Sequence, residues 1–181
     1  MKKLFKLIIL AAVIIGLINY IPKFIEYLFP LSYNIYVEET AQKYGVDKNL
    51  VYAVIKAESN FDAKIESRRG AKGLMQLMSS TADWCAGEIG LESYDIFEPK
   101  DNIELGVYYL SYLLKYYNGN EKNAVSAYNA GRGNVDEWIA DRTYSADGEN
   151  LDEIPFEETQ KYARKIIFYR KIYAWRSGRL T

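Results

Sequence analysis

The chain has 181 residues, with 23 Lys and Arg against 24 Asp and Glu and a formal net charge of −1. This balance lacks the basic excess that nucleic-acid binding needs, so we expect no nucleic-acid partner. Histidine is absent and Cys85 is the single cysteine. These absences exclude Ser-His-Asp and Cys-His nucleophile systems in their usual form, His-based zinc sites and an internal disulfide. We therefore expect no metal and no cofactor, and we expect Cys85 to be a small buried apolar residue.

The first predicted element is a membrane-spanning helix at the N-terminus. Three lysines, Lys2, Lys3 and Lys6, precede an uninterrupted apolar run from Leu7 to Ile18. A span from Leu4 to Ile21 covers about 27 Å of helix, just enough for a hydrocarbon core of about 30 Å. A cleaved signal peptide is the main alternative, but no small-residue cleavage site follows the run. We expect a retained single-pass signal anchor, with the lysines on the cytoplasmic side.

After residues 1–30, which comprise the basic tip, the anchor and a short linker, residues 31–181 are predicted to form one all-α domain. Its length suits a single core. Caps, stops and apolar spacing define its helices, with Ser32 as the expected cap of the first and Asp47 of the second. No segment has a convincing strand alternation, although the loop at 140–155 leaves room for a small β element. The helices are expected over residues 32–44, 47–58, 79–90, 101–117, 121–129, 135–139 and 157–175, with a turn at 118–120.

Glu58 is the first candidate for chemistry. It continues an apolar stripe of Val51, Val54 and Ile55 at i, i+3, i+4, i+7 spacing, which directs its carboxyl toward the buried face of a helix. Burial disfavours the charged form, so the pKa of Glu58 should rise until it holds a proton near neutral pH. A glutamate at a helix end is more often ordinary surface, so this interpretation needs support from other segments.

Three further clusters bear on Glu58. In the segment from Gly70 to Gln76, two glycines let the backbone approach a ligand, and the Gln76 amide offers a donor and an acceptor. A tight turn between helices explains that segment equally well. The segment from Ala127 to Gly131 is typical of a helix C-terminus. Tyr162, in the last helix, either directs its hydroxyl at a carboxyl or simply packs.

Taken together, the order and spacing of these segments resemble the soluble lytic transglycosylase domain of bacterial cell walls. The resemblance covers about Val46 to Trp175. It rests on ESNF from Glu58, GAKGLMQLM from Gly70, the helix from Asn102 to Leu114, AYNAG from Ala127 and IPFEETQKY from Ile154.

The resemblance implies a lysozyme-like, mainly helical fold with a glycan groove. Departures from the family pattern are small: Ala63, Ser79 and Arg132 stand where proline is common, and Ala163 where valine is common. The resemblance also implies the site residues. Glu58 would be the catalytic acid/base, Ser59 would help to position it or the substrate, Tyr162 would lie close to Glu58, and the sugar subsites would be lined by Met75, Gln76, Tyr128 and Asn129.

The activity that the resemblance implies is cleavage of the β-1,4 bond between N-acetylmuramic acid and N-acetylglucosamine, with formation of a 1,6-anhydromuramyl end. The partners would be peptidoglycan glycan strands. The catalytic domain would be monomeric and would lie on the extracytoplasmic side of the bacterial cell membrane. Two alternatives remain. One is a lysozyme-type muramidase that uses Asp62 or Glu66 to direct water, because ordinary glycosidases need two carboxyls. The other is a non-catalytic glycan-binding or assembly protein of the cell envelope.

Overall fold

The computed structural model describes residues 2–178, and the chain divides into two units, Met1–Leu31 and Ser32–Thr181. The first unit contains α1, Lys2–Leu28. From Lys3 to Leu28 this helix has the length and composition needed to cross a membrane. A signal sequence would meet the same criteria. Apolar side chains along it, such as Leu4 and Leu17, are exposed. The helix thus presents apolar surface that a helix of a soluble protein would bury.

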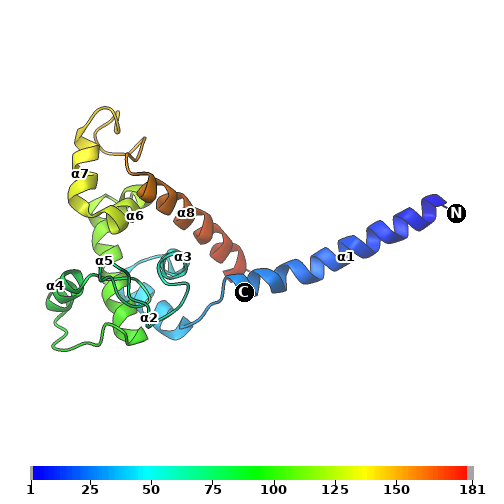
Figure 1. Ribbon diagram of the computed structural model, residues 1–181, viewed down its shortest axis with the longest axis horizontal. Helices are drawn as coiled ribbons and strands as arrows, with labels where there is room; N and C mark the ends of the chain where they lie inside the picture. Colours follow the sequence, from blue (N-terminus) through cyan, green and yellow to red (C-terminus); the bar gives the residue numbers. More distant parts are fainter. Residues whose placement is uncertain (1, 179–181) are drawn as a thin grey trace. The chain divides into compact units, whose positions relative to one another are not determined.

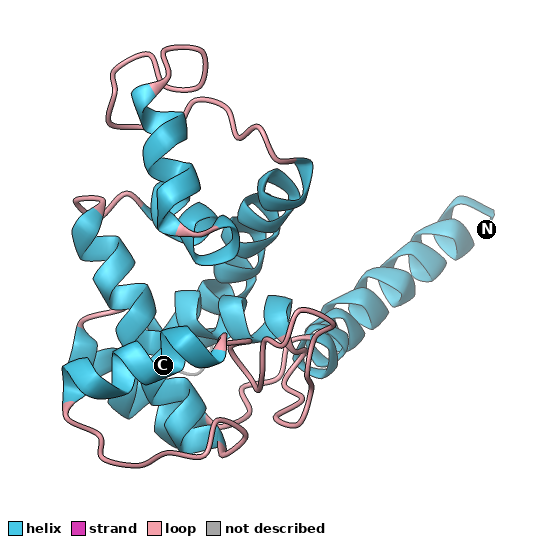
Figure 2. Ribbon diagram, turned by 60° about the vertical axis from the view of Figure 1, so that its left-hand side comes forward, coloured by secondary structure: helices cyan, strands magenta, loops and turns pink. Residues whose placement is uncertain are grey.

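The second unit is built from helices (Figure 1). Between residues 32 and 178 no strand is present, and Figure 2 shows only helices and connecting loops. Two isolated antiparallel bridges, Glu66 with Lys72 and Lys72 with Leu77, form the β pairing of the described residues. The all-α prediction is therefore confirmed, and the loop before the last helix holds no β element. The helices are α2 Asn34–Tyr44, α3 Lys48–Glu58, α4 Ser79–Ile89, α5 Pro99–Tyr116, α6 Glu121–Ala130, α7 Arg132–Ala140 and α8 Glu157–Ser177.

Most helix ends follow the predicted signals. The Asp47 carboxylate caps α3 by accepting the backbone N–H of Asn49 at 2.9 Å, and α2 stops at Gly45 in the left-handed conformation. The prediction that Ser32 caps α2 is wrong. The helix begins after Tyr33, whose φ of 61° turns the chain without any side-chain cap bond. Sequence signals therefore place a helix end well where a capping side chain or a glycine in the left-handed conformation satisfies the free backbone groups.

α3 is the buried centre of the second unit. The predicted stripe of Val51, Val54 and Ile55 is confirmed, but every residue from Leu50 to Ile55 is buried, so the helix is covered on all sides. Among the described elements, α8 makes the most extensive contact with it. The two helices therefore fix each other's position, and the C-terminal end of α3 lies against residues of α8.

Arg170 of α8 adds a polar tie to this packing. Its guanidinium contacts the Asp47 carboxylate at 2.8 Å and the Glu121 carboxylate at 3.0 Å. Because Asp47 caps α3 and Glu121 starts α6, one side chain links the beginnings of two helices to α8. A planar fork of donors suits a cation that serves two carboxylates at once.

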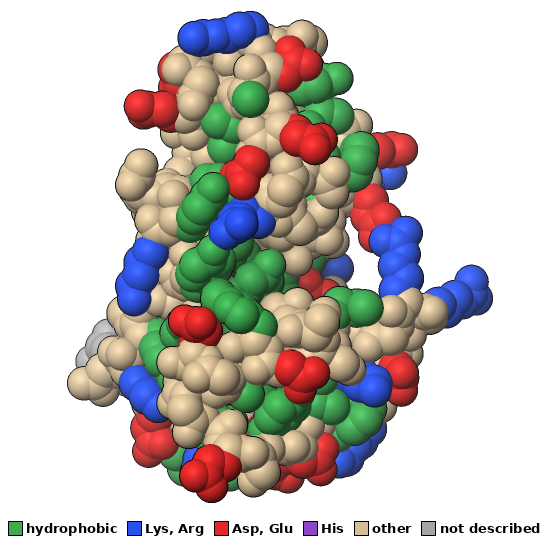
Figure 3. Space-filling model, turned by 90° about the vertical axis from the view of Figure 1, so that its left-hand side faces the viewer, with side chains coloured by type: hydrophobic (Ala, Val, Ile, Leu, Met, Phe, Trp, Pro, Cys, Tyr) green, Lys and Arg blue, Asp and Glu red, His purple; other side chains and the backbone are tan. Residues whose placement is uncertain are grey.

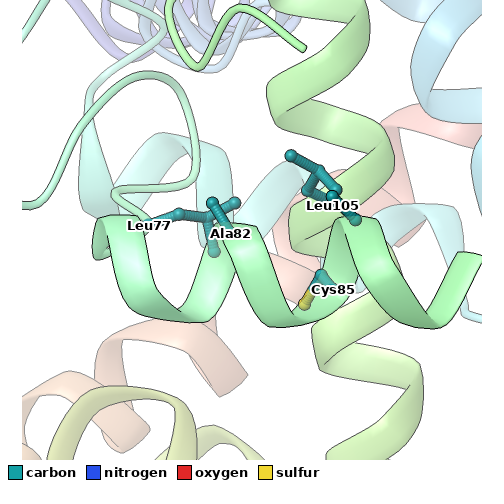
Figure 4. Packing of buried hydrophobic residues seen from close by; sticks show 5 residues of the cluster. Leu77, Ala82, Cys85 and Leu105 are labelled. Carbon is teal, nitrogen blue, oxygen red and sulfur yellow. The ribbon is translucent and has the colours of Figure 1, made fainter. Parts of the chain in front are cut away.

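A second buried cluster joins α4 to α5, formed by Leu77, Ala82, Cys85, Ala86 and Leu105 (Figure 4). Cys85 is fully buried, which confirms its predicted role as a small apolar residue, and burial raises the pKa of its thiol to about 12. Leu77 directly follows Gln76, so the cluster also anchors the segment that carries Met75 and Gln76.

Asn102 holds that same segment from the other side. Its side chain is fully buried, with Oδ1 accepting the Met75 N–H at 2.8 Å and Nδ2 donating to the carbonyls of Lys72 at 3.0 Å and Ile96 at 2.8 Å. Gly73 is required beside it, because its φ is +74° and a Cβ there would lie 2.6 Å from the Ile96 carbonyl oxygen. One buried amide thus satisfies three backbone groups and fixes the loop.

Candidate active site

Glu58 and Tyr162 meet where the end of α3 lies against α8. The Tyr162 hydroxyl donates a hydrogen bond to the Glu58 carboxyl oxygen Oε1 at 2.6 Å, across 104 positions of sequence. Tyr162 is buried, and burial raises the pKa of its hydroxyl well above the ordinary value. Tyr162 therefore keeps its proton near neutral pH and acts as a donor toward Glu58. The Glu58 side chain itself is partly buried.

Burial raises the pKa of Glu58 from 4.5 to about 7. The hydrogen bond from Tyr162 and the charge of Lys165 both lower this pKa, but the effect of burial is larger. None of these three causes is a second carboxyl. A carboxyl with this pKa is protonated in a large fraction of molecules near neutral pH, which is what a general acid needs.

Lys165 is a site residue that the sequence analysis missed. Its ammonium donates to the Ala57 carbonyl at 3.2 Å, in the last turn of α3, where a positive charge is favourable. Its positive charge also lowers the pKa of Glu58, the residue that follows Ala57. Lys165 lies one helical turn after Tyr162, so i, i+3 spacing from that tyrosine was the signal that would have found it.

Ser59 fixes the turn that follows Glu58. Its Oγ donates to the Ile55 carbonyl at 3.1 Å and accepts the Phe61 N–H at 3.1 Å. Asn60 and Phe61 have φ values of 51° and 67°, a conformation that side-chain-bearing residues rarely adopt. The structure therefore places Ser59 in a buried position that shapes the backbone beside the carboxyl.

Gln76 and Met75 lie in the loop that Asn102 holds. The Gln76 side-chain amide donates to the carbonyls of Gly73 at 2.9 Å and Ile65 at 3.2 Å, so its nitrogen closes the loop. The Met75 side chain is fully buried. A Cβ on Gly106 would lie 2.8 Å from the Met75 Cβ, so α5 can approach Met75 closely only at a glycine. The Met75 side chain thus packs in the core against α5.

Tyr128 and Asn129 connect the end of α6 to this loop and to α8. The Tyr128 hydroxyl donates to the Met75 carbonyl at 2.8 Å, and the charge of Glu58 adds to the effect of burial in raising the Tyr128 pKa. The Asn129 carbonyl oxygen Oδ1 accepts the Thr159 hydroxyl at 2.8 Å. Asn129 and Thr159 line a hollow of about 580 Å³, and Glu158 also lies in its wall. The structure thus gathers Tyr128, Tyr162 and Glu58 together, with Asn129 at the edge of a cavity.

The other candidate carboxyls lie apart from this arrangement. The Asp62 carboxylate accepts the Lys64 N–H at 2.9 Å in an exposed turn, and Glu66 belongs to the bridge with Lys72. Neither contributes to the pKa shift of Glu58. Within residues 2–178 no group of His, Cys, Asp and Glu is arranged to hold a metal ion.

Comparison with known proteins places this arrangement in a family. Residues 35–151 match the model of the transglycosylase SLT domain. The soluble lytic murein transglycosylase of Escherichia coli K12 is 30% identical over 159 residues, which cover 85% of this chain and 25% of that protein. Membrane-bound lytic murein transglycosylase C of Yersinia pestis is 37% identical over 111 residues, covering 55% of this chain and 31% of that protein. The chain belongs to the transglycosylase SLT domain family.

Solved structures agree with this assignment. The 70 kDa soluble lytic transglycosylase of Escherichia coli superposes with a TM-score of 0.78 at 30% identity, over 85% of this chain and 26% of that one. An inactive mutant of the lytic transglycosylase Slt from Pseudomonas aeruginosa gives 0.77 at 31% identity, over 84% and 25% of the respective chains. The predicted lysozyme-like transglycosylase fold is confirmed. The chain spans about a quarter of the length of the soluble relatives.

The raised pKa of Glu58 predicts how stability depends on pH. The folded state keeps this proton between pH 4.5 and about 7 while the unfolded chain releases it, so stability falls as pH rises through that window. Glu58→Gln cannot ionise. We compare the free energy of unfolding of the variant and the wild type by urea unfolding of the full chain in detergent. The difference, variant minus wild type, should be about 1–3 kcal/mol larger at pH 8 than at pH 4. An unchanged difference at the two pH values would contradict the raised pKa.

Proposed function

We propose that the chain is a membrane-anchored peptidoglycan lytic transglycosylase, with residues 1–30 as anchor and linker and residues 31–181 as the catalytic domain. The observation that carries the proposal is the Glu58 carboxyl, partly buried, hydrogen-bonded by Tyr162 and with a pKa of about 7. Membership of the SLT family, together with relatives named lytic murein transglycosylases, supports murein as the substrate. The solved Pseudomonas relative, inactive after a Glu-to-Gln substitution, supports dependence on one glutamate in that enzyme.

In the proposed reaction, Glu58 first acts as an acid. Its proton passes to the glycosidic oxygen between N-acetylmuramic acid and N-acetylglucosamine, and the C1–O bond breaks with charge developing on the muramic ring. Tyr162 holds the carboxyl in one orientation and, as a donor, stabilises the carboxylate that remains. Lys165 of α8, whose ammonium binds the last turn of α3, stabilises that same negative charge.

In the second step, the Glu58 carboxylate acts as a base. It takes the proton of the muramic C6 hydroxyl while that oxygen closes onto C1, so Glu58 is protonated again and a 1,6-anhydromuramyl end is formed without water. Because the nucleophile belongs to the substrate, orientation replaces the second carboxylate that ordinary glycosidases use. Tyr128, Tyr162 and the loop at Gln76 are proposed to hold the sugars in that orientation.

The hydrolase alternative has less support. A muramidase needs a second carboxyl to direct water. In the loop after α3, Asp62 binds the Lys64 N–H and Glu66 pairs with Lys72, and neither contributes to the pKa shift of Glu58. A non-catalytic glycan-binding protein would have no use for a carboxyl whose burial costs stability above neutral pH. The burial of Glu58 therefore favours a catalytic protein over a glycan-binding one.

Glu58→Gln should strongly reduce activity while leaving the fold intact. The amide keeps the size of the carboxyl and the contact with Tyr162 but cannot donate a proton to the leaving oxygen, so turnover should fall by roughly 10²–10⁴. Release of soluble fragments from purified peptidoglycan measures it, with Asp62→Asn as the matched control, expected to stay near wild type. If Glu58→Gln digested the wall as fast as Asp62→Asn, the catalytic assignment would be wrong.

The anchor proposal rests on the exposed apolar surface of α1 and the lysines that precede it. Cytoplasmic retention of those lysines puts the catalytic domain outside. Protease added to intact spheroplasts should therefore remove the domain, and a cytoplasmic marker protein should survive. Recovery of the domain from the medium with an N-terminus beyond Ile21 would instead show a cleaved signal peptide.

A further inference from the structure

A second hollow, of about 430 Å³, lies between α4, α5 and α7. Its walls include Trp84, Tyr109 and Tyr112, with the Trp84 ring 4.9 Å from that of Tyr112 and 6.2 Å from that of Tyr109, centroid to centroid. Figure 3 looks onto this side of the second unit and shows hydrophobic side chains gathered across a hollowed face. Aromatic walls of this kind suit the faces of sugar rings.

Arg132 is the one charged residue among those that line this hollow. Its Nη1 donates to the Tyr112 hydroxyl, and its guanidinium carbon lies 4.8 Å from the centre of the Tyr116 ring. Its Nε lies 3.6 Å from the Asp136 carboxylate, which already accepts hydrogen bonds from two tyrosine hydroxyls. No described residue accepts a hydrogen bond from Nη2. Arg132 is thus held in place by its neighbours while keeping donors for a ligand.

This hollow adjoins the Glu58 site through neighbouring aromatic rings. Tyr109, in its wall, lies 5.3 Å from Tyr128, centroid to centroid. The Tyr128 hydroxyl binds the Met75 carbonyl, and the charge of Glu58 acts on it. A glycan strand bound at Glu58 therefore has an aromatic surface along which to continue toward Arg132.

We propose that Arg132 binds a carboxylate carried by a muramic acid residue of the strand. The sugar backbone of peptidoglycan is uncharged, whereas each muramic acid bears a lactyl carboxyl, either free or extended by a stem peptide with carboxylates of its own. A guanidinium held at the edge of an aromatic wall pairs with a carboxylate through parallel hydrogen bonds. Arg132 is then a specificity-determining residue of the proposed transglycosylase, on whose substrate this inference rests.

Equilibrium binding to the full chain in detergent, in the Glu58→Gln background, tests this without cleavage. Three ligands are compared: strands with stem peptides, strands stripped by an amidase so that the lactyl carboxylate is free, and chitin oligosaccharides without any carboxylate. Adding Arg132→Gln should weaken binding of carboxylate-bearing strands about tenfold and leave chitin oligosaccharides unchanged. Loss with the stripped strands alone assigns the free lactyl carboxylate, and loss with the stem-bearing strands alone assigns a carboxylate of the stem peptide. Loss with both kinds of strand shows that Arg132 binds either carboxylate.

The matched controls separate charge from shape. Arg132→Lys should recover part of the lost affinity, and Arg142→Gln, which removes an exposed arginine of the loop after α7, should bind like the parent. The Arg132 effect should shrink at high salt. Equal weakening with chitin oligosaccharides, or no weakening at all, would overturn the inference. Because the readout is binding, failure of the wild-type chain to cleave would instead count against the proposed function alone.

Discussion

The hydrogen bond between Tyr162 and Glu58 is the contact on which the site depends. Burial makes an ionised carboxyl unfavourable, and a single tyrosine donor with a nearby lysine offsets only part of that cost. The result is a carboxyl whose pKa lies near neutral pH, where it can both give and take a proton. A stronger set of donors would have made Glu58 an ordinary carboxylate, unable to act as an acid.

The rest of the fold keeps that balance in place. α3 is enclosed on all sides and ends at Glu58, so the backbone of the carboxyl cannot shift without disturbing the core. Arg170 ties α8 to the beginning of α3, and Lys165 ties it to the end. Two polar contacts and a long packed interface thus set the register that brings Tyr162 to Glu58.

Much of this was predictable because the signals are local. Helical spacing gave the buried stripe of α3, and Asp47 and Gly45 gave helix ends, since each acts within one turn of its own position. The helix start at Asn34 was missed because Tyr33 turns the chain by its backbone alone. Asn102 was missed as a site-forming residue because its partners are backbone groups of distant segments, which no spacing within one helix reveals. Lys165 was missed although its i, i+3 spacing from Tyr162 places it on the same side of α8, because its partner is a carbonyl at the end of α3.

The same distinction applies to the chemistry. The stripe predicted a raised pKa for Glu58, while the meeting of Glu58 with Tyr162 came from resemblance to a family. The central claim is that Glu58 works without a second carboxyl. Mass spectrometry of muropeptides released from purified peptidoglycan tests it most directly. The account predicts anhydromuramyl ends, each one water lighter than the reducing form. Reducing-end muramic acid as the main product would contradict it and would point to a water-directing carboxyl such as Asp62 or Glu66.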